Sequence, residues 1–286
     1  MTAAGTVPCG TGQPGTNQHY DQDPELFGLF LDPLRKYSSG LYEWPDDTLA
    51  TAQERKLRFV AWRLGLDGGE TVLDVGCGWG SLVLFMAAEF GCAATGISPA
   101  PRQHAYIAER ARELGVADRV RTQAADFEDA RLPIRAFDAV TMLGSIVHMP
   151  SLDAAFGKAR GLLRRGGTLY VSESCFRSGA AREAHGTRAG TEFVRDGIFG
   201  WGDMRPLSDL VEAAENAGFT VIAVDDLTDH YHRTIEDWLA NVRRNRQRID
   251  ELAPGYSAGL ERYLEIANAG WGYTTKHYAL TCRNSR

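Results

Sequence analysis

The residues best suited to ligand chemistry form the glycine-rich segment LDVGCGWG at positions 73–80. Gly76 and Gly78 would let the backbone approach a ligand at a helix N-terminus. Similar turns bind dinucleotides, but Asp74 stands just before these glycines, the segment has no basic residue, and the third-glycine spacing of the dinucleotide pattern is missing. The loop, with Cys77 at its centre, therefore favours a sulfonium cofactor with a positive amino group over a pyrophosphate.

Further cofactor contacts are expected where the next two strand-like segments end, because open α/β sheets bind ligands at their carboxyl edge. In GISPAPRQ (96–103), Ile97 and Ser98 would lie beside a ribose, with Gln103 one helical turn further on. In AADFED (124–129), Asp126 would accept a hydrogen bond from an adenine amino group while Phe127 packs on the ring. Ordinary surface and core positions remain the alternative for Gln103 and Phe127.

Three polar side chains are candidates for catalysis in a neighbouring acceptor pocket. His148 ends the apolar run TMLGSIVHMP, Glu173 lies in TLYVSES (168–174), and Tyr231 lies in DHYHRT. Such groups transfer protons when they are held within hydrogen-bond reach of a reacting atom. The alternatives are structural: His148 would bond the following loop, and the alternation along the strand leaves open whether Glu173 faces the pocket.

Alternating strand-like and helix-like segments from Glu70 onward must position these residues. Strands are predicted from β-branched apolar runs, and helices from 3.6-residue periodicity. The predicted strands are 71–76, 93–98, 119–125, 137–143, 168–174, 219–227 and 272–284, and the predicted helices are 81–91, 101–115, 152–167, 207–218 and about 233–267. This alternation predicts an α/β fold with a doubly wound sheet and helices on both faces.

The succession of strand-like and helix-like segments divides the chain into five parts. They are a disordered tail (1–18), an N-terminal helical cap segment (19–68), a cofactor-binding core (69–176), a helical lid insertion (177–206) and a C-terminal part of the core with substrate-pocket helices (207–286). The lid is predicted because the segment is too long for a strand-to-helix connection. It would cover the carboxyl edge of the sheet.

Composition excludes several classes of function. The 286 residues carry a net charge of −6, which disfavours nucleic acid as a partner. No apolar run is long enough to span a bilayer, and the N-terminus lacks the pattern of a signal peptide, so we expect a cytoplasmic protein without stable membrane insertion. Five widely spaced cysteines predict reduced thiols and no metal site. The oligomeric state stays open.

Three segments in order resemble a known family. LDVGCGWG, the preceding HYDQDPELFGLFLDPLRKYSSGLY (19–42) and the C-terminal segment from LVEAAENAGF to NRQRI are similar to the cyclopropane-fatty-acid synthase family of S-adenosylmethionine-dependent methyltransferases. The resemblance implies a seven-stranded, Rossmann-like methyltransferase sheet with an antiparallel last strand and a helical cap. It also implies that the backbone of Tyr37 and Ser38 closes over the cofactor carboxylate and that Leu143 and Gly144 flank the sulfonium.

The chain departs from this family at the site of a bicarbonate ion that acts as the base in ring closure. By the family pattern, Val147 replaces a glutamate, Ser39 replaces a cysteine and Ser172 replaces a histidine, whereas Tyr231 is retained. A change from carboxylate to valine removes both charge and hydrogen bonding. The resemblance therefore disfavours cyclopropanation.

The sequence thus predicts a methyltransferase that uses S-adenosyl-L-methionine, releases S-adenosyl-L-homocysteine and acts on a small, largely apolar molecule of specialised metabolism. Nitrogen is the first choice of nucleophile because no strong base constellation is visible, and oxygen and carbon follow. The alternatives are a lipid C-methyltransferase acting on an unsaturated acyl chain, a cyclase or binding protein that retains the cofactor, and a nicotinamide oxidoreductase, which Asp74 disfavours most.

Overall fold

Seven strands form one sheet in the order β3-β2-β1-β4-β5-β7-β6 in the computed structural model, which describes residues 23–197 and 202–285. The strands are β1 Thr71–Val75, β2 Ala93–Ser98, β3 Val120–Ala124, β4 Phe137–Leu143, β5 Leu163–Phe176, β6 Thr220–Asp226 and β7 Thr275–Arg283. β1 to β5 pair in parallel, whereas β7 runs antiparallel to both β5 and β6. The predicted α/β fold with an antiparallel last strand is confirmed, and the predicted tail at 1–18 lies outside the described residues.

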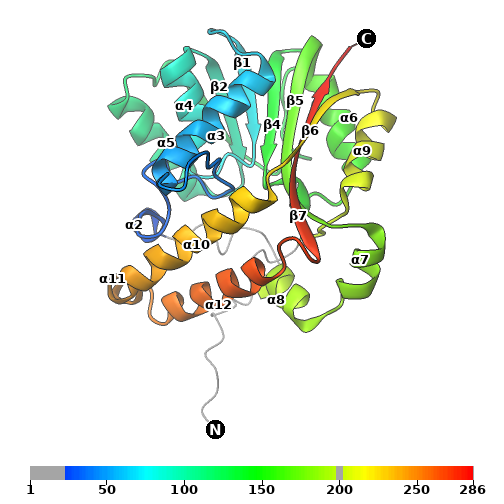
Figure 1. Ribbon diagram of the computed structural model, residues 1–286. Coiled ribbons are helices and arrows are strands. Elements are labelled where there is room, and N and C mark those ends of the chain that lie inside the picture. The colour runs from blue at the N-terminus through cyan, green and yellow to red at the C-terminus, as the bar shows by residue number, and fades with distance from the viewer. Residues whose placement is uncertain (1–22, 198–201, 286) are drawn as a thin grey trace.

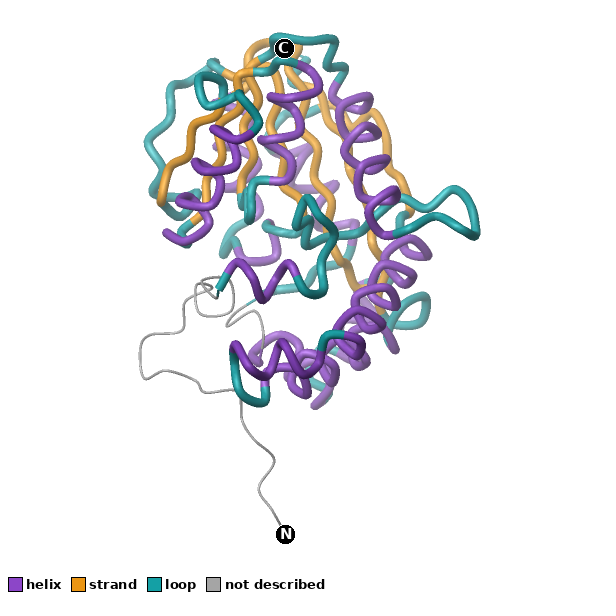
Figure 2. Tube along the Cα trace, turned by 90° about the vertical axis from the view of Figure 1, so that its left-hand side faces the viewer, coloured by secondary structure: helices purple, strands orange, loops and turns teal. Residues whose placement is uncertain are grey.

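Helices cover both faces of the sheet, as Figures 1 and 2 show. α3 (Leu49–Leu64), α4 (Ser81–Phe90) and α5 (Pro101–Glu113) pack on one face, and α6 (Leu152–Leu162) and α9 (Leu207–Asn216) pack on the other. Successive strand residues point to opposite faces, so in β1 Val72 joins the α3–α4 cluster while Leu73 joins the α6–α9 cluster. The sheet is thereby buried on both sides, as parallel sheets require.

A cap of helices lies beyond the carboxyl ends of the parallel strands (Figure 1). Its members are α7 Gly179–His185, α8 Ala189–Gly197, α10 Thr228–Arg244, α11 Arg246–Leu252 and α12 Tyr256–Ala269, while α2 (Pro24–Gly28) packs against α5. The insertion 177–206 is helical at α7 and α8. The helical stretch predicted over about 233–267 is present, but it is divided into α10, α11 and α12 by breaks at Asn245 and at Pro254 and Gly255, where Gly255 adopts a φ of 77°.

One predicted helix ends earlier than the sequence suggested. The prediction extended it to residue 167, but α6 ends at Leu162 and the chain continues directly into β5. Leu163 pairs with Phe137 of β4, and the backbone then turns at Gly166, whose φ is 81°. Pairing with the sheet therefore overrides the local helical pattern of Leu163 to Gly167.

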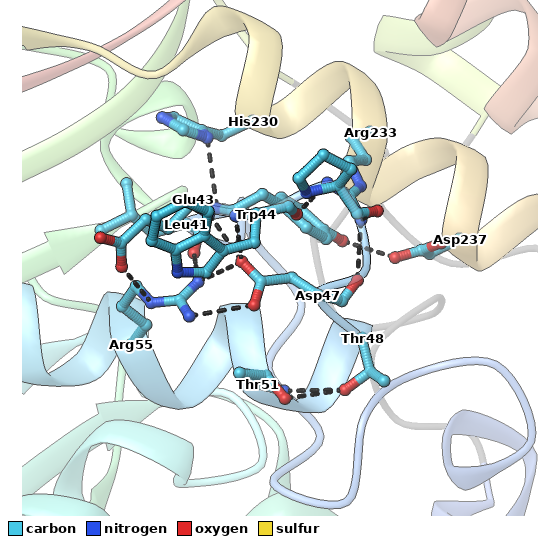
Figure 3. Close-up of polar contacts among 12 residues, drawn as sticks. Leu41, Glu43, Trp44, Asp47, Thr48, Thr51, Arg55, His230, Arg233 and Asp237 are labelled. Carbon is cyan, nitrogen blue, oxygen red and sulfur yellow. Dashed lines mark hydrogen bonds and ion pairs between the residues drawn. The ribbon is translucent and has the colours of Figure 1, made fainter.

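The N-terminal loop that follows Tyr37 and Ser38 is held against α10 by a polar network (Figure 3). Arg233 donates to the carbonyl oxygens of Trp44, Pro45 and Asp47 at 2.9, 2.7 and 2.8 Å. Its guanidinium carbon also lies 4.2 Å from the centre of the Tyr42 ring. Thr234, His230 and Asp237 of α10 also bond this loop, at Gly40 and Tyr42, so Arg233 is one of several α10 side chains that fix its course.

Arg233→Ala should lower the free energy of unfolding by about 2 kcal/mol, because it leaves three carbonyl groups without their charged donor at a half-buried position. Urea denaturation measures the change. Arg244→Ala is the matched control on the same helix, since the Arg244 guanidinium is exposed and bonds only the Asn241 side chain among the described residues. Equal urea midpoints for the two variants would show that the hydrogen bonds of Arg233 do not stabilise this loop.

Candidate functional site at the carboxyl edge

Two cavities lie between the carboxyl edge of the sheet and the cap. One, of about 170 Å³, lies over the loop from β1 to α4. The other, of about 750 Å³, lies between β5, α7, α10 and α12. Tyr37 and Gly144 line both cavities, so a molecule bound in one can meet a molecule bound in the other at this junction.

The smaller cavity gathers most of the residues that the sequence assigned to a cofactor. They are Tyr37, Gly76, Cys77, Gly78, Ile97, Ser98, Gln103, Asp126, Phe127 and Leu143. Ser98 donates a hydrogen bond to Oε1 of Gln103 at 2.5 Å, and this bond orders the end of β2. Ser38 lines the larger cavity, and Asp74 lines neither. Binding by these residues stays a prediction, but their convergence on one cavity is observed.

The glycines of the loop serve two different geometric needs. Gly76 has a φ of 77°, and a Cβ there would lie 2.4 Å from the Cβ of Ser145. Gly78 has a φ of 53°, but a Cβ there would meet nothing within 4 Å. Gly76 therefore permits close contact with the loop after β4, and Gly78 leaves the backbone open to the cavity, as ligand binding at the N-terminus of α4 requires.

Asp74 was expected to contact the cofactor, but it lies beneath the glycine loop. It is 1% exposed, and the Thr141 hydroxyl donates to one of its carboxylate oxygens at 2.7 Å. The reason is register: Asp74 pairs with Thr141 between two central strands, so its side chain is buried. Burial raises its pKa, while the charge of Lys36 opposes that rise. Asp74 therefore acts on the cavity through its electrostatic interaction with Lys36, which lines the cavity.

Glu173 is a buried carboxylate in the wall of the larger cavity. It is 6% exposed and accepts hydrogen bonds from the backbone amides of Val147 at 3.2 Å and Ser174 at 2.8 Å. Burial raises the pKa of Glu173 to about 7, and the amide hydrogen bonds oppose this rise. The alternation that the sequence left open is thus settled: the side chain faces the cavity and titrates near neutral pH.

A group of rings stands beside this carboxylate. The Tyr231 ring centre lies 5.0 Å from that of Trp271 and 4.6 Å from that of His277. Nε2 of His277 is 2.8 Å from the Ser172 hydroxyl, and burial, helped by the charge of Lys56, lowers the pKa of His277 to about 3. His277 is therefore neutral. His277 was not among the site residues predicted from the sequence, although its place in a strand with alternating apolar residues was a usable signal.

His148 lies elsewhere than expected. It ends the short helix η1 (Ile146–His148), its backbone amide donates to the Ser145 carbonyl, and its side chain lines the smaller cavity. Among the described residues, the larger cavity is lined by Glu173 and Tyr231 but not by His148. The catalytic roles predicted for His148, Glu173 and Tyr231 stay predictions, and the structure places Glu173 and Tyr231 together in the larger cavity and His148 in the smaller one.

Other polar side chains lie beside two of the positions where the chain departs from the family pattern, and the prediction that cyclopropanation is disfavoured stays a prediction. Val147 supplies no carboxylate, but Glu173 reaches its backbone amide from the neighbouring strand β5. Ser172 supplies no imidazole, but His277 of β7 hydrogen-bonds its hydroxyl. Glu173, His277 and Tyr231 all line the larger cavity.

No group of three or more His, Cys, Asp or Glu side chains in 23–197 and 202–285 is arranged to hold a metal ion. Within the same residues, no helix has the length and apolar character needed to cross a membrane.

Comparison with known sequences identifies the family. The model of the mycolic acid cyclopropane synthetase family matches residues 13–279. A probable fatty acid methyltransferase of Pseudomonas putida is 30% identical over 257 residues, covering 89% of this chain and 64% of its own length. Sphingolipid C9-methyltransferase B of Emericella nidulans is 31% identical over 270 residues, covering 92% of this chain and 51% of its own length. The chain thus spans between half and two thirds of the length of these relatives.

Solved structures agree with that result. The mycolic acid cyclopropane synthase CmaA1, complexed with SAH and CTAB, superposes with a TM-score of 0.85 at 26% identity and covers 94% of this chain and 96% of its own. The [4+2]-cyclase SpnF gives a TM-score of 0.79 at 25% identity, with 98% of both chains covered. The resemblance to cyclopropane-fatty-acid synthases is confirmed, and the chain belongs to the mycolic acid cyclopropane synthetase family of S-adenosylmethionine-dependent methyltransferases.

Proposed function

We propose that the protein is an S-adenosylmethionine-dependent methyltransferase that methylates the nitrogen of a small amine with a largely apolar body. The observation that carries this proposal is the buried carboxylate of Glu173, which lies among aromatic rings in a cavity that meets the smaller one at Tyr37 and Gly144. A methyl donor in the smaller cavity would face an acceptor in the larger one through that junction.

The smaller cavity fits this cofactor by its chemistry. Gly78 leaves room for a ligand beside the N-terminus of α4, and the exposed Asp126 offers a carboxylate to hydrogen-bond donors of a sugar or base. Phe127, which is 4% exposed, offers an apolar surface next to it. When bound, the cofactor would supply an already activated methyl group, so alignment of the acceptor provides much of the rate acceleration.

The charge of the larger cavity favours a cation. Its described lining contains four carboxylates, of Glu173, Glu183, Asp203 and Asp209, and the single guanidinium of Arg182. Arg182 is already paired, at 2.8 Å with Asp203 and at 3.5 Å with Asp209. The cavity therefore attracts a protonated amine and disfavours a carboxylate or phosphate ligand.

Glu173 would convert the attracted ammonium into the nucleophile. A carboxylate whose pKa is about 7 accepts a proton from an ammonium group at neutral pH more readily than one of ordinary pKa. The freed nitrogen lone pair then forms the bond to the methyl carbon while the carbon–sulfur bond breaks, so the positive charge passes from sulfur to nitrogen. Amides of Val147 and Ser174 hold the carboxylate in place throughout.

Aromatic rings complete the acceptor site. Tyr231, Tyr263 and Trp271 line the larger cavity together with Phe176 and Ile266. Ring faces attract cations and also bury apolar surface, so one wall suits both parts of an amphipathic amine.

A second candidate is C-methylation of an unsaturated acyl chain, because the curated relatives are named as fatty acid and sphingolipid methyltransferases. The rings of Tyr231 and Trp271 would stabilise a carbocation, and Glu173 would take the proton that it loses. The two candidates share the same base and differ in the acceptor.

Isotopic methyl transfer separates these candidates. The protein is incubated with methyl-labelled S-adenosylmethionine and matched panels of apolar amines and unsaturated acyl substrates, and products are analysed by mass spectrometry. The proposal predicts label on nitrogen. Label on acyl carbon selects the second candidate, and a converted substrate without label points to a cyclase.

Glu173→Gln should lower kcat/KM for the amine by about 10²- to 10³-fold, because it removes the proton acceptor. In the wild type, kcat/KM should rise with pH through a limb near the Glu173 pKa of about 7, and this limb should be absent in the variant. Glu212→Gln, an exposed change on α9, is the control and should leave the profile intact. If kcat/KM of Glu173→Gln still rose with pH near 7 as it does in the wild type, Glu173 would be excluded as the base.

The same carboxylate should make stability depend on pH. The pKa of Glu173 is raised to about 7 from 4.5 by burial, so the folded protein binds its proton more tightly than the unfolded chain does. Protonated Glu173 therefore contributes fully to the free energy of unfolding below pH 4.5, and this contribution is lost as pH rises through about 7. Urea titrations of the wild type and Glu173→Gln should show a wild-type deficit that grows between pH 5 and pH 8, and a constant difference would contradict this.

A further inference from the structure

Lys36 is a cationic residue of the cavity walls that has no role in the function proposed above. Lys36 lines the smaller cavity and is only 5% exposed. It follows Arg35, whose φ of 54° is uncommon for a residue with a side chain. The Asp32 carboxylate fixes this turn by accepting hydrogen bonds from the backbone amides of Leu34 at 2.9 Å and Lys36 at 2.7 Å. The position of Lys36 is thus built into the fold.

Lys36 belongs to a buried group of four charges beneath the cavity. The others are Asp32, Lys56 and Asp74, which are 4%, 3% and 1% exposed. The Lys56 ammonium has a hydrogen-bond acceptor, the Ser38 hydroxyl at 2.7 Å. Burial raises the pKa of both carboxyls and lowers the pKa of both lysines, and the described residues show no direct ion pair among the four.

The Lys36 ammonium lacks a direct partner among the residues that the structure describes. No carboxylate oxygen there lies within 4 Å of it, and no described group accepts a hydrogen bond from it. Burial lowers the pKa of Lys36, whereas the more distant charges of Asp74, Cys77 and Asp32 oppose this shift. The side chain is largely withdrawn from water, but its nitrogen is not fully enclosed and opens to the cavity that Lys36 lines, where a ligand carboxylate would pair with it.

We infer that Lys36 receives the carboxylate of the cofactor's amino-acid tail in the smaller cavity, an inference that rests on the cofactor binding proposed above. Asp126 and Lys36 both line this cavity: Asp126 offers a carboxylate to a sugar or base, and Lys36, next to Tyr37 in the chain and within electrostatic reach of Cys77 in the glycine loop, offers a cation. With the sulfur at the junction of Tyr37 and Gly144, the tail would extend along the glycine loop toward Lys36.

Arg35 is the competing cation, but its geometry points elsewhere. Its guanidinium carbon lies 4.2 Å from the centre of the Tyr106 ring on α5 and 6.0 Å from that of Trp79. Its Nη2 lies beside Gly28 at the end of α2, 3.2 Å from where a Cβ would stand. The guanidinium thus packs between α2 and α5.

Calorimetry with two ligands isolates the carboxylate contact. S-adenosylhomocysteine and its decarboxylated analogue, S-adenosyl-3-thiopropylamine, are titrated into the wild type, Lys36→Met and Lys36→Gln. The inference predicts that the wild type binds S-adenosylhomocysteine more tightly than the analogue by about tenfold or more, the size of a charged hydrogen bond. In both variants this preference should fall to about threefold or less, while affinity for the analogue changes little.

Other results would overturn the inference. Equal weakening of both ligands in the variants would mean that Lys36 only supports the fold, and an unchanged preference would mean that it does not touch the tail. Loss of the preference in Arg35→Met but not in Lys36→Gln would transfer the contact to Arg35. Lys36→Gln keeps a polar group of similar length, so it provides the measurement even where Lys36→Met fails to fold. A wild type that binds neither ligand would instead refute the cofactor proposal itself.

Discussion

Burial of charge at one edge of the sheet is the constraint on which the rest of the structure depends. Asp74 near the end of β1 and Glu173 near the end of β5 are both almost fully buried. The fold compensates the two carboxylates differently: Thr141 donates a hydrogen bond to Asp74, which also lies near Lys36 and Lys56, whereas Glu173 accepts hydrogen bonds from the backbone amides of Val147 and Ser174. One carboxylate therefore sits in a balanced charge cluster, and the other keeps a pKa near neutrality and is able to exchange a proton.

The junction between the two cavities explains why the cap is tied so firmly to the core. Tyr37 lines both cavities, and its ring packs 5.0 Å from that of Trp238 on α10 and 6.0 Å from that of Phe27 on α2. The loop that follows is bound by Arg233 of the same α10. A donor and an acceptor held on opposite sides of this junction would keep their alignment, because α10 supplies Tyr231 and Ile235 to the larger cavity and also packs against Tyr37 at the junction.

The sequence predicted the sheet, its antiparallel last strand and nearly all of the smaller cavity, because glycine turns and strand ends are local signals that topology brings to one edge. It failed where partners come from distant segments. The orientation of Glu173 depends on the amide of Val147, and His277 takes the place beside Ser172 only through the pairing of β5 and β7. An aspartate just before the glycine loop predicted a cofactor contact, but Asp74 pairs with Thr141 in the centre of the sheet and is buried there. Lys36 gave no signal, since its burial depends on a turn held by Asp32.

A methyl donor in the smaller cavity would face Glu173 through the opening at Tyr37 and Gly144. A crystal structure of the protein with S-adenosylhomocysteine tests this most directly. The account predicts the adenine beside Asp126 and Phe127 and the sulfur at the junction, with open space between it and the Glu173 carboxylate. A ligand that lies in the larger cavity, or whose sulfur faces away from that opening, would contradict it.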